Sequence, residues 1–412
     1  MKTAAIIGGG AAGMTAAILL KEAGFDVTLF ERQDRIGKKI LQTGNGRCNI
    51  SHTGISEKNY VGRDTEKIRK ILSSFDEKRE RAFLSGLGIE LCERDGCLYP
   101  VSRQASSVLD AYRFRLAERK VRILTDTEVT GIRQRKNGYE LLTKTPDGNR
   151  GYGDFAVCIL ACGGMAGVYQ EAAHNGYEIT KAMGHSLTGL HPALTPVRCE
   201  EDFKAAAGIR ADAGLTLTVN GKVAGKEQGE VQFTDSGLSG IPVFQLTLLI
   251  RDPERTENRI ALDLLGFLGD DNEAAYGRFT KRAKAMKERT LEEFFAGWLQ
   301  KKLAVFLIKN AGLKTSSAVS DFTEKDLDRL YHTARNLTFK VKKCGDWRSA
   351  QIQCGGVPME ELNERLESRK MKGIYLIGEM LDAAGMCGGY NLHFALASAH
   401  CCADALIGGA GQ

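Results

Sequence analysis

The first thirty residues constrain the fold most, because an apolar strand, a glycine-rich turn, a helix and a second strand ending in an acid follow one another. The turn has the spacing G-x-G-x-x-G, with Gly8, Gly10 and Gly13 at the three glycine positions. These glycines permit a tight turn, let the backbone approach a pyrophosphate, and let the helix pack closely on the strand. The amino end of the helix then offers N–H groups to the phosphates. The segment therefore predicts a dinucleotide-binding βαβ unit.

The acid at the end of the second strand supports this prediction. Glu31 stands where a carboxylate accepts hydrogen bonds from a ribose 2′-hydroxyl, an arrangement that disfavours a 2′-phosphate. A glycine motif alone is weak evidence, but here strand, helix, spacing and acid agree. The alternative is a glycine-rich βα connection that binds nothing.

Length and composition set the protein class. The 412 residues suggest two or three domains, and a hydrophobic content of 43% with 26% charged residues is typical of globular proteins. We see no signal peptide and no apolar run near the roughly 20 residues of a membrane helix, so we expect a cytoplasmic protein. The eleven cysteines include no CxxC pair or zinc-like array, which indicates reduced thiols and no metal site. The net charge of +6 does not demand a polyanionic partner.

The chain is organised as one nucleotide-binding domain with a long insertion. The apolar run from Phe155 to Ala161 predicts a buried parallel strand that returns to the first sheet. From about residue 191 short alternating segments suggest an antiparallel β region, and residues 271–312 have helical spacing. The apolar stripe of that helical region favours core packing over a cofactor surface.

A second glycine-rich element near the end of the chain favours a flavin over a nicotinamide. The strand 373–377 is followed by Glu379 and Asp382, either of which can accept a hydrogen bond from a ribitol hydroxyl. A helix that begins after Gly389 can aim its N–H groups at the flavin pyrimidine edge, where negative charge accumulates on reduction. The alternative is a strand-to-helix turn whose glycines serve packing only.

The segment 37–49 carries positive charge. Lys38, Lys39 and Arg47 can bring cations beside the pyrophosphate and the reducible ring. Lys39 and Arg47 can alternatively be solvated surface charges.

The same segment contains the run Gly44–Asn49, here called the GNGRCN loop. Gly44 and Gly46 allow the backbone close to a flat ligand. Asn45 and Asn49 can offer amides to the polar ring edge. Cys48 is small enough to lie beside the ring, and a redox role is disfavoured because no resolving cysteine lies at CxxC spacing.

The opening motif, the segment 36–49, the segment 350–357 and the closing Gly-Glu and Gly-Gly-Tyr-Asn run together resemble one family. This is the FAD-dependent oxidoreductase family that includes aminoacetone-oxidase-like and BaiN-like (bile-acid reductase) proteins, distantly similar to fumarate reductase flavoproteins. The match covers nearly the whole chain. Many relatives carry a histidine where this chain has Asp235, so no role resting on that histidine is carried over.

The resemblance implies an α/β fold: a Rossmann-like FAD-binding domain (1–190 and 346–412), an inserted β-barrel-like domain (191–265 and 334–345) and a helical cap (266–333). It also implies that Val129 meets the adenine edge. Motifs and resemblance together predict these cofactor-binding residues: Gly8, Gly10, Ala11, Ala12, Gly13, Glu31, Arg32, Lys39, Gly44, Asn45, Gly46, Arg47, Cys48, Asn49, Val129, Ala161, Gly163, Gly164, Gly378, Glu379, Asp382, Gly389, Tyr390, Asn391 and Leu392.

The sequence does not place a catalytic residue; Arg47, Tyr390 and His393 are loop or helix-start candidates only. His185, His191 and His393 are more typical of structural histidines. In the run His400–Cys402 adjacent side chains point to different helix faces, which favours core packing over a metal site. The basic run 281–289 is typical of a solvated helix face.

Three functions remain open. The first is an enzyme in which FAD takes a hydride from NAD(P)H and reduces an activated C=C bond of a small, steroid- or bile-acid-like molecule. In the opposite direction, the same enzyme would oxidise a small amine and pass the electrons to dioxygen, as an aminoacetone oxidase does. Residues 161–164 lack the acid of a second dinucleotide motif, so NAD(P)H would be a transient visitor. The second is a flavoprotein acting on RNA, disfavoured because the basic run lacks interleaved aromatic residues. The third is a nucleotide-binding regulator. The oligomeric state is not indicated.

Overall fold

The computed structural model describes residues 2–167, 170–250 and 255–408 of the 412-residue chain. It divides into two compact units. Unit 1 comprises Met1–Pro192 and Trp347–Gln412, and unit 2 comprises Ala193–Asp346. The domain boundaries predicted from the sequence lie at 190/191 and 345/346.

A five-stranded parallel sheet forms the centre of unit 1, in the order β20-β11-β1-β2-β7. The strands are β1 (Thr3–Ile7), β2 (Asp26–Phe30), β7 (Arg122–Leu124), β11 (Val157–Leu160) and β20 (Ile374–Leu376). β11 pairs in parallel with both β1 and β20, so the prediction of a buried strand returning to the first sheet is confirmed. The strand order brings the first and last strands of the sheet together through β11.

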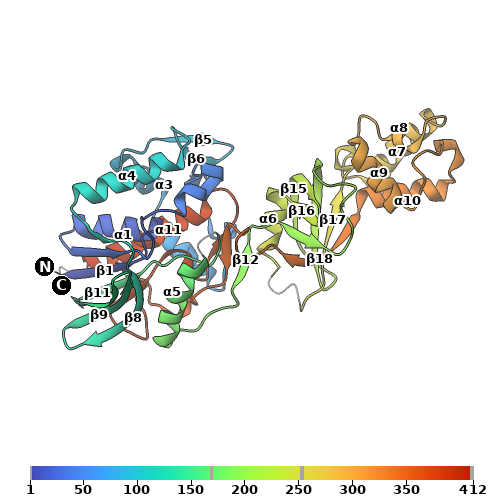
Figure 1. Cartoon of the computed structure of the whole chain (residues 1–412). Coiled ribbons are helices and arrows are strands. Elements are labelled where there is room, and N and C mark those ends of the chain that lie inside the picture. Colours follow the sequence, from blue (N-terminus) through green and yellow to red (C-terminus); the bar gives the residue numbers. More distant parts are fainter. Residues whose placement is uncertain (1, 168–169, 251–254, 409–412) are drawn as a thin grey trace. The chain divides into compact units, whose positions relative to one another are not determined.

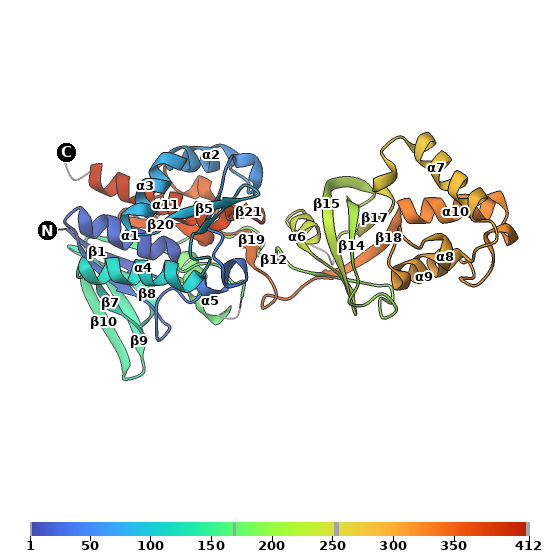
Figure 2. The ribbon, with the colours of Figure 1, turned by 90° about the horizontal axis from the view of Figure 1, so that it is seen from above.

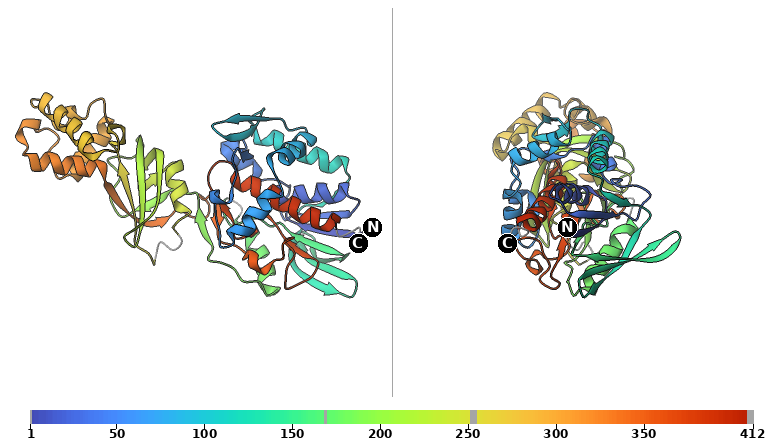
Figure 3. Two further views of the ribbon diagram at one scale, coloured as in Figure 1. Left: turned by 180° about the vertical axis from the view of Figure 1, so that it is seen from behind. Right: turned by 90° about the vertical axis from the view of Figure 1, so that its left-hand side faces the viewer.

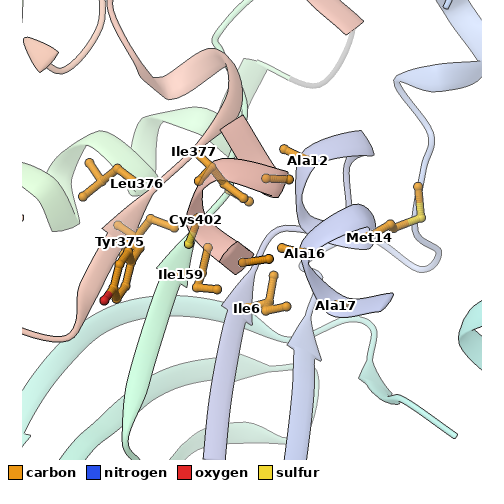
Figure 4. Packing of buried hydrophobic residues seen from close by; sticks show 14 of the residues in the cluster. Ile6, Ala12, Met14, Ala16, Ala17, Ile159, Tyr375, Leu376, Ile377 and Cys402 are labelled. Carbon is orange, nitrogen blue, oxygen red and sulfur yellow. The ribbon is translucent and has the colours of Figure 1, made fainter. Parts of the chain in front are cut away.

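The two helices that follow β1 and β20 lie side by side. α1 (Ala11–Glu22) packs on β1 and β2 and contacts both α11 (Tyr390–Gly408) and α4 (Ala105–Glu118), and Figures 1 and 3 show α11 alongside α1. Small side chains make this close packing possible: Ala12, Ala16 and Ala17 of α1 lie close to the apolar side chains of the sheet and to Cys402 of α11 (Figure 4). Residues nearly 400 positions apart are thus neighbours in one core.

Unit 1 is completed by further helices and short strands. These are α2 (Thr65–Ser73), α3 (Glu77–Gly86), α5 (Gln170–Ala182), β3 (Ser51–His52), β4 (Tyr60–Val61), β5 (Leu91–Arg94), β6 (Cys97–Pro100), β8 (Glu128–Arg135), β9 (Gly138–Thr145), β10 (Gly148–Phe155), β12 (His191–Ala193), β19 (Ile352–Cys354), β21 (Ala384–Gly385), η1 (Ile40–Gly46), η2 (Glu57–Asn59), η5 (Met359–Glu361) and η6 (Gly378–Met380). The antiparallel sheet β10-β9-β8 lies on the side of the parallel sheet away from α1 (Figure 1).

Unit 2 contains a closed six-stranded barrel in the order β13-β16-β15-β14-β17-β18. Its elements are β13 (Val197–Cys199), β14 (Arg210–Val219), β15 (Lys222–Thr234), β16 (Gly237–Ser239), α6 (Ile241–Thr247), β17 (Asn258–Asp263), η3 (Gly266–Leu268), α7 (Asn272–Ala285), α8 (Leu291–Phe294), α9 (Lys301–Asn310), η4 (Val319–Asp321), α10 (Glu324–Arg335) and β18 (Leu337–Cys344). Helices α7 to α10 gather at one end of the barrel (Figure 2). The predicted barrel and helical region are confirmed.

The apolar stripe of the helical region is core, as predicted. Leu291, Phe294 and Phe295 are fully buried, and Trp298 packs partly buried against the same cluster. In the basic run of α7, Arg282 donates to the carbonyl oxygens of Phe294 and Ala296, and its guanidinium lies over the Trp298 ring at 4.4 Å. One cation of that run therefore serves packing. No helix of the described residues is long and apolar enough to cross a membrane.

Candidate functional site

A cleft opens in unit 1 where β1, β2 and β11 end. Its volume is about 930 Å³, including the solvent in its mouth. Its lining contains nine of the predicted cofactor-binding residues: Gly8, Gly10, Glu31, Arg32, Lys39, Val129, Ala161, Gly163 and Gly164. Ligands of open α/β sheets bind at the carboxyl ends of the strands, which is where this cleft lies.

The three glycines of the opening motif differ in what surrounds them. A Cβ on Gly8 would lie 2.4 Å from the carbonyl oxygen of Ala161, and one on Gly13 would lie 1.9 Å from that of Gly8. A Cβ on Gly10 would meet no atom within 4 Å. Gly8 and Gly13 are therefore required by the fold, whereas Gly10 leaves open space at the edge of the cleft.

Gly10 is also the N-cap of α1 and has no side chain to cap the helix. The N–H groups of the first turn, which include those of Ala11 and Ala12, have no partner within the helix itself. They lie at the positive end of the helix dipole and next to the open space at Gly10. This end of the cleft can bind an anion such as a diphosphate.

Glu31 lies at the end of β2 and lines the same cleft. One of its carboxylate oxygens accepts from the N–H of Gly9 at 2.8 Å, and the other accepts from the N–H of Gln33 at 2.8 Å. Burial raises the pKa of the Glu31 carboxyl, while these backbone N–H groups act in the opposite direction. Each oxygen keeps a free lone pair, so the carboxylate can still accept from a ribose hydroxyl.

An ion pair connects the first loop of the chain to the closing segment. Lys39 Nζ lies 2.6 Å from a carboxylate oxygen of Glu379, although 340 residues separate them. The same oxygen accepts from the N–H of Gly164 at 3.2 Å, and the other accepts from that of Gln353 at 3.3 Å. Glu379 therefore draws together three of the four segments that resemble the flavoprotein family. Lys39 is thus held in an ion pair while its side chain stays 37% exposed, and its contact with a cofactor stays a prediction.

The GNGRCN loop has a strained backbone. Gly44, Asn45, Gly46 and Cys48 all have φ between +52° and +82°. Glycine adopts this region without cost, and asparagine tolerates it better than most residues. Arg47 is exposed. The loop is thus shaped by its own sequence and presents its polar backbone and Arg47 outward.

Two residues of this loop are turned into the protein. Cys48 is fully buried, and burial raises the pKa of its thiol to about 11 despite a hydrogen bond with Thr43. The amide nitrogen of Asn49, in the orientation that satisfies both of its polar atoms, donates to the carbonyl oxygens of Ser51 (2.9 Å) and Leu98 (3.2 Å). The sequence predicts that the Asn49 amide faces the polar edge of the flavin ring. In the structure this amide instead fastens the GNGRCN loop to Ser51 and Leu98.

The environment of Cys48 predicts an unreactive thiol. With a pKa of about 11, only about one molecule in a thousand carries the thiolate at pH 8, and solvent does not reach it. We expect iodoacetamide at pH 8 to leave Cys48 unmodified in the native protein and to modify it after denaturation, as measured by peptide mass spectrometry. Equal modification of native and denatured protein would contradict this placement.

The start of α11 packs against the residues that follow the GNGRCN loop. A Cβ on Gly389 would lie 2.5 Å from the carbonyl oxygen of Ser51. The Tyr390 ring stacks on the His52 ring, with centroids 5.0 Å apart and planes inclined by 19°. The Asn391 side chain bonds both the N–H and the carbonyl of Gly385 at 2.8 Å. The two glycine-rich elements therefore form one joined structure.

The remaining closing residues support this junction. Gly378 donates its N–H to Ser398 Oγ of α11 at 2.9 Å, and a Cβ there would lie 3.0 Å from that of Ala12 in α1. Asp382 is 7% exposed and its N–H donates to the carbonyl of Val357. A cofactor contact of Asp382 or Leu392 stays a prediction.

The histidines expected to be structural have internal partners. His185 is bonded by Glu361 and Ser368, each at 2.7 Å. His400 is buried, its Nδ1 bonds the carbonyl of Leu396, and burial lowers its pKa to about 4. Among the described residues no group of histidine, cysteine and carboxylate side chains could hold a metal ion.

Several residues that line or shape the cleft were not predicted as site residues. Gln42 and Thr127 line it, and Gln353 is buried and accepts from the N–H of Met165 at 2.7 Å behind it. In the sequence these three residues resemble any other polar residue near the end of a strand. Lys38, which also lines the cleft, carried a signal as part of the basic pair with Lys39.

The chain is similar to known proteins over nearly its whole length. Residues 2–405 match the family described as HI0933-like protein Rossmann domain. A 3-dehydro-bile acid Δ(4,6)-reductase of Clostridium scindens is 34% identical, with 97% of this chain and 98% of the relative covered. A ribosomal RNA dihydrouridine synthase of Escherichia coli K12 is 27% identical, with 98% of each chain covered.

One solved structure shares the fold across the chain. The 3-ketosteroid Δ1-dehydrogenase of Sterolibacterium denitrificans, solved in complex with 1,4-androstadiene-3,17-dione, has a TM-score of 0.53 and 12% identity, and the alignment covers 99% of this chain and 100% of that one. At this identity the likeness concerns the fold alone.

Proposed function

The chain belongs to the HI0933-like Rossmann-domain family and is a flavin-dependent oxidoreductase, and from this premise we propose that it holds FAD in the cleft of unit 1 and reduces a C=C bond conjugated to a carbonyl group. One observation carries the proposal: the opening motif, the segment 36–52 and the closing segment meet through the Gly378–Ala12 contact, the Lys39–Glu379 ion pair and the Gly389–Ser51 contact. A ligand that uses all three must be long, as FAD is.

The residues present fit this cofactor. The open space at Gly10 and the uncapped first turn of α1 suit a diphosphate, and Arg32, Lys38 and Lys39 line the same cleft with positive charge. Glu31 suits the ribose of the adenosine part.

Each element has a distinct proposed task. The first turn of α1 binds the diphosphate, Glu379 accepts from the ribitol, and the GNGRCN loop with the start of α11 surrounds the flavin ring. Bound FAD supplies a hydride acceptor and donor at its N5 atom. The positive end of α11 favours the negative charge that a reduced ring carries. The chain thereby orients the ring and sets its electronic character.

The names of two relatives point to one bond type. A 3-dehydro-bile acid carries its Δ4 and Δ6 double bonds in conjugation with the 3-oxo group, and the C5=C6 bond of uridine is conjugated with the C4 carbonyl. Reduction of such a conjugated bond adds a hydride to the carbon of the C=C bond farther from the carbonyl and a proton to the nearer one. Because identity is higher to the bile-acid enzyme, we assign this chain a small steroid-like enone, with NAD(P)H as electron donor.

The proposal is tested by reducing the purified yellow protein anaerobically with NADH or NADPH and then adding a 3-oxo-4-ene steroid acid. We expect the flavin absorbance near 450 nm to disappear with the nicotinamide and to return with the enone, together with the dihydro product in a mass spectrum. Loss of the colour with no return for any enone would contradict the assigned substrate. Reduction of the flavin by aminoacetone in place of NAD(P)H, followed by reoxidation with dioxygen to hydrogen peroxide, would support the amine-oxidase alternative.

A second candidate is the same reduction on a uracil ring in ribosomal RNA. It is favoured by the near-complete coverage of two ribosomal RNA dihydrouridine synthases, at 27% and 24% identity. The two candidate substrates are distinguished by incubating the reduced protein with a ribosomal RNA transcript and measuring dihydrouridine by nucleoside mass spectrometry. Its formation, with no turnover of enones, would replace the steroid assignment.

A further inference from the structure

Three polar side chains form a buried network beneath the junction of the GNGRCN loop and α11. Ser51 is fully buried, Glu80 is 1% exposed and His393 is 3% exposed. Ser51 Oγ donates to one Glu80 oxygen at 2.9 Å, His393 Nδ1 lies 3.1 Å from the other, and Ser51 Oγ and His393 Nδ1 are 3.0 Å apart. The three residues come from β3, α3 and α11, so the network joins parts of the chain up to 342 residues apart.

The hydrogen bonds define which nitrogen of His393 carries a proton. Ser51 has one hydroxyl hydrogen, which goes to the Glu80 carboxylate. His393 Nδ1 then contacts two acceptors, Ser51 Oγ and a Glu80 oxygen. Both contacts therefore require that Nδ1 carries the proton. Because both partners use the same nitrogen, the arrangement is not a hydrolytic triad, in which base and carboxylate contact opposite ring nitrogens.

Such a network costs desolvation free energy, and a buried polar cluster is weak evidence for added stability. Its position suggests another use. Ser51 lies two residues after the end of the GNGRCN loop, and its backbone is the surface on which Gly389 packs. His393 lies in the first turn of α11, where its N–H donates to the carbonyl of Gly389. Tyr60 adds a bond from its hydroxyl to the carbonyl of Tyr390 at 2.8 Å.

We propose that Ser51, Glu80 and His393 are positioning residues, which fix the start of α11 against the GNGRCN loop and so set how tightly and in what orientation the flavin ring is held. This inference rests on the proposed function, because it assumes that these two elements surround the ring. None of them lines the cleft, and Glu80 and His393 instead border a second cavity beside His52. The three residues therefore act on the ring through the backbone they hold.

Unit 1 contains a control network of the same three residue types, in which the two partners contact opposite nitrogens of the histidine ring. Ser368, His185 and Glu361 form a second serine–histidine–glutamate network, with Ser368 Oγ and the Glu361 carboxylate each 2.7 Å from a His185 nitrogen. Ser368 is 5% exposed and also accepts from the N–H groups of Lys370 and Met371. None of these three residues lines the cleft.

The test compares Ser51→Ala with Ser368→Ala and measures the affinity of each protein for FAD and for ADP, a probe that lacks the ring. Removing one hydrogen bond changes affinities by up to about tenfold. We expect Ser51→Ala to weaken FAD about tenfold and to alter the shape of the visible flavin band, while ADP binds as in the wild type. Ser368→Ala should change neither affinity.

A second variant covers the case in which Ser51→Ala does not fold. Glu80→Gln keeps the volume and removes the charge, and it should show the same loss for FAD with unchanged ADP binding. Equal effects on FAD and ADP, or no effect on either, in the folded variants would overturn the positioning role. Failure of the wild-type protein to bind FAD would instead defeat the proposed function, and this inference with it.

Discussion

Gly10→Val is expected to give a folded protein that purifies without flavin. The valine side chain finds free space, since a Cβ at this position meets no atom within 4 Å, and φ at Gly10 is −80°, which any residue adopts. That same space is where a diphosphate would approach the first turn of α1. We expect FAD affinity to fall by at least about 100-fold, or roughly 2.8 kcal/mol, as measured by titration of the apoprotein.

The matched control is Gly86→Val. Gly86 lies at the end of α3, and a Cβ there also meets nothing within 4 Å, but the residue is outside the cleft. This variant should remain yellow. Gly10→Val with a full complement of FAD would show that the diphosphate does not lie at α1, whatever else binds the cofactor.

Gly13→Val should have the opposite phenotype and damage the fold itself. The new Cβ would lie 1.9 Å from the carbonyl oxygen of Gly8, in the turn that joins β1 to α1. Backbone cannot yield as a flexible side chain does, so α1 must move off the sheet. Overpacking of this kind costs about 3 kcal/mol or more, a large part of the stability of a domain. The measurement is the urea midpoint of the apoprotein by circular dichroism, where ligand binding does not contribute.

Comparing the two valine variants separates binding from folding within one motif. Gly10→Val should keep the wild-type urea midpoint without FAD, and Gly13→Val should lower it or prevent expression. Similar midpoints for both would mean that the close approach of α1 to β1 is not as described.

The parts of the fold that could be predicted are those with local signals. The βαβ unit is specified by glycines at the G-x-G-x-x-G spacing and by a run of apolar residues, and β11 by a continuous apolar stretch. The barrel strands alternate, and the helical stripe repeats at helical spacing. α4 was missed although Val108, Leu109, Tyr112 and Leu116 are buried at helical spacing.

The candidate site depends on contacts that no local pattern encodes. Nothing around Ser51 or Glu80 distinguishes them from other polar residues, and Glu80 lies in a helix whose neighbours are charged and exposed. Their roles follow from α3, β3 and α11 meeting in space. The same holds for His393, a candidate catalytic residue from its place at a helix start, which is buried in this network. Arg47 remains exposed, and a catalytic role for it stays a prediction.

The central claim is that one FAD molecule is bound by both ends of the chain, and a crystal structure of the FAD complex tests it most directly. We expect the diphosphate within hydrogen-bonding distance of the N–H groups at the start of α1, and the flavin ring between the GNGRCN loop and Tyr390. Electron density for the ring away from the start of α11, or for the diphosphate away from Gly10, would contradict it.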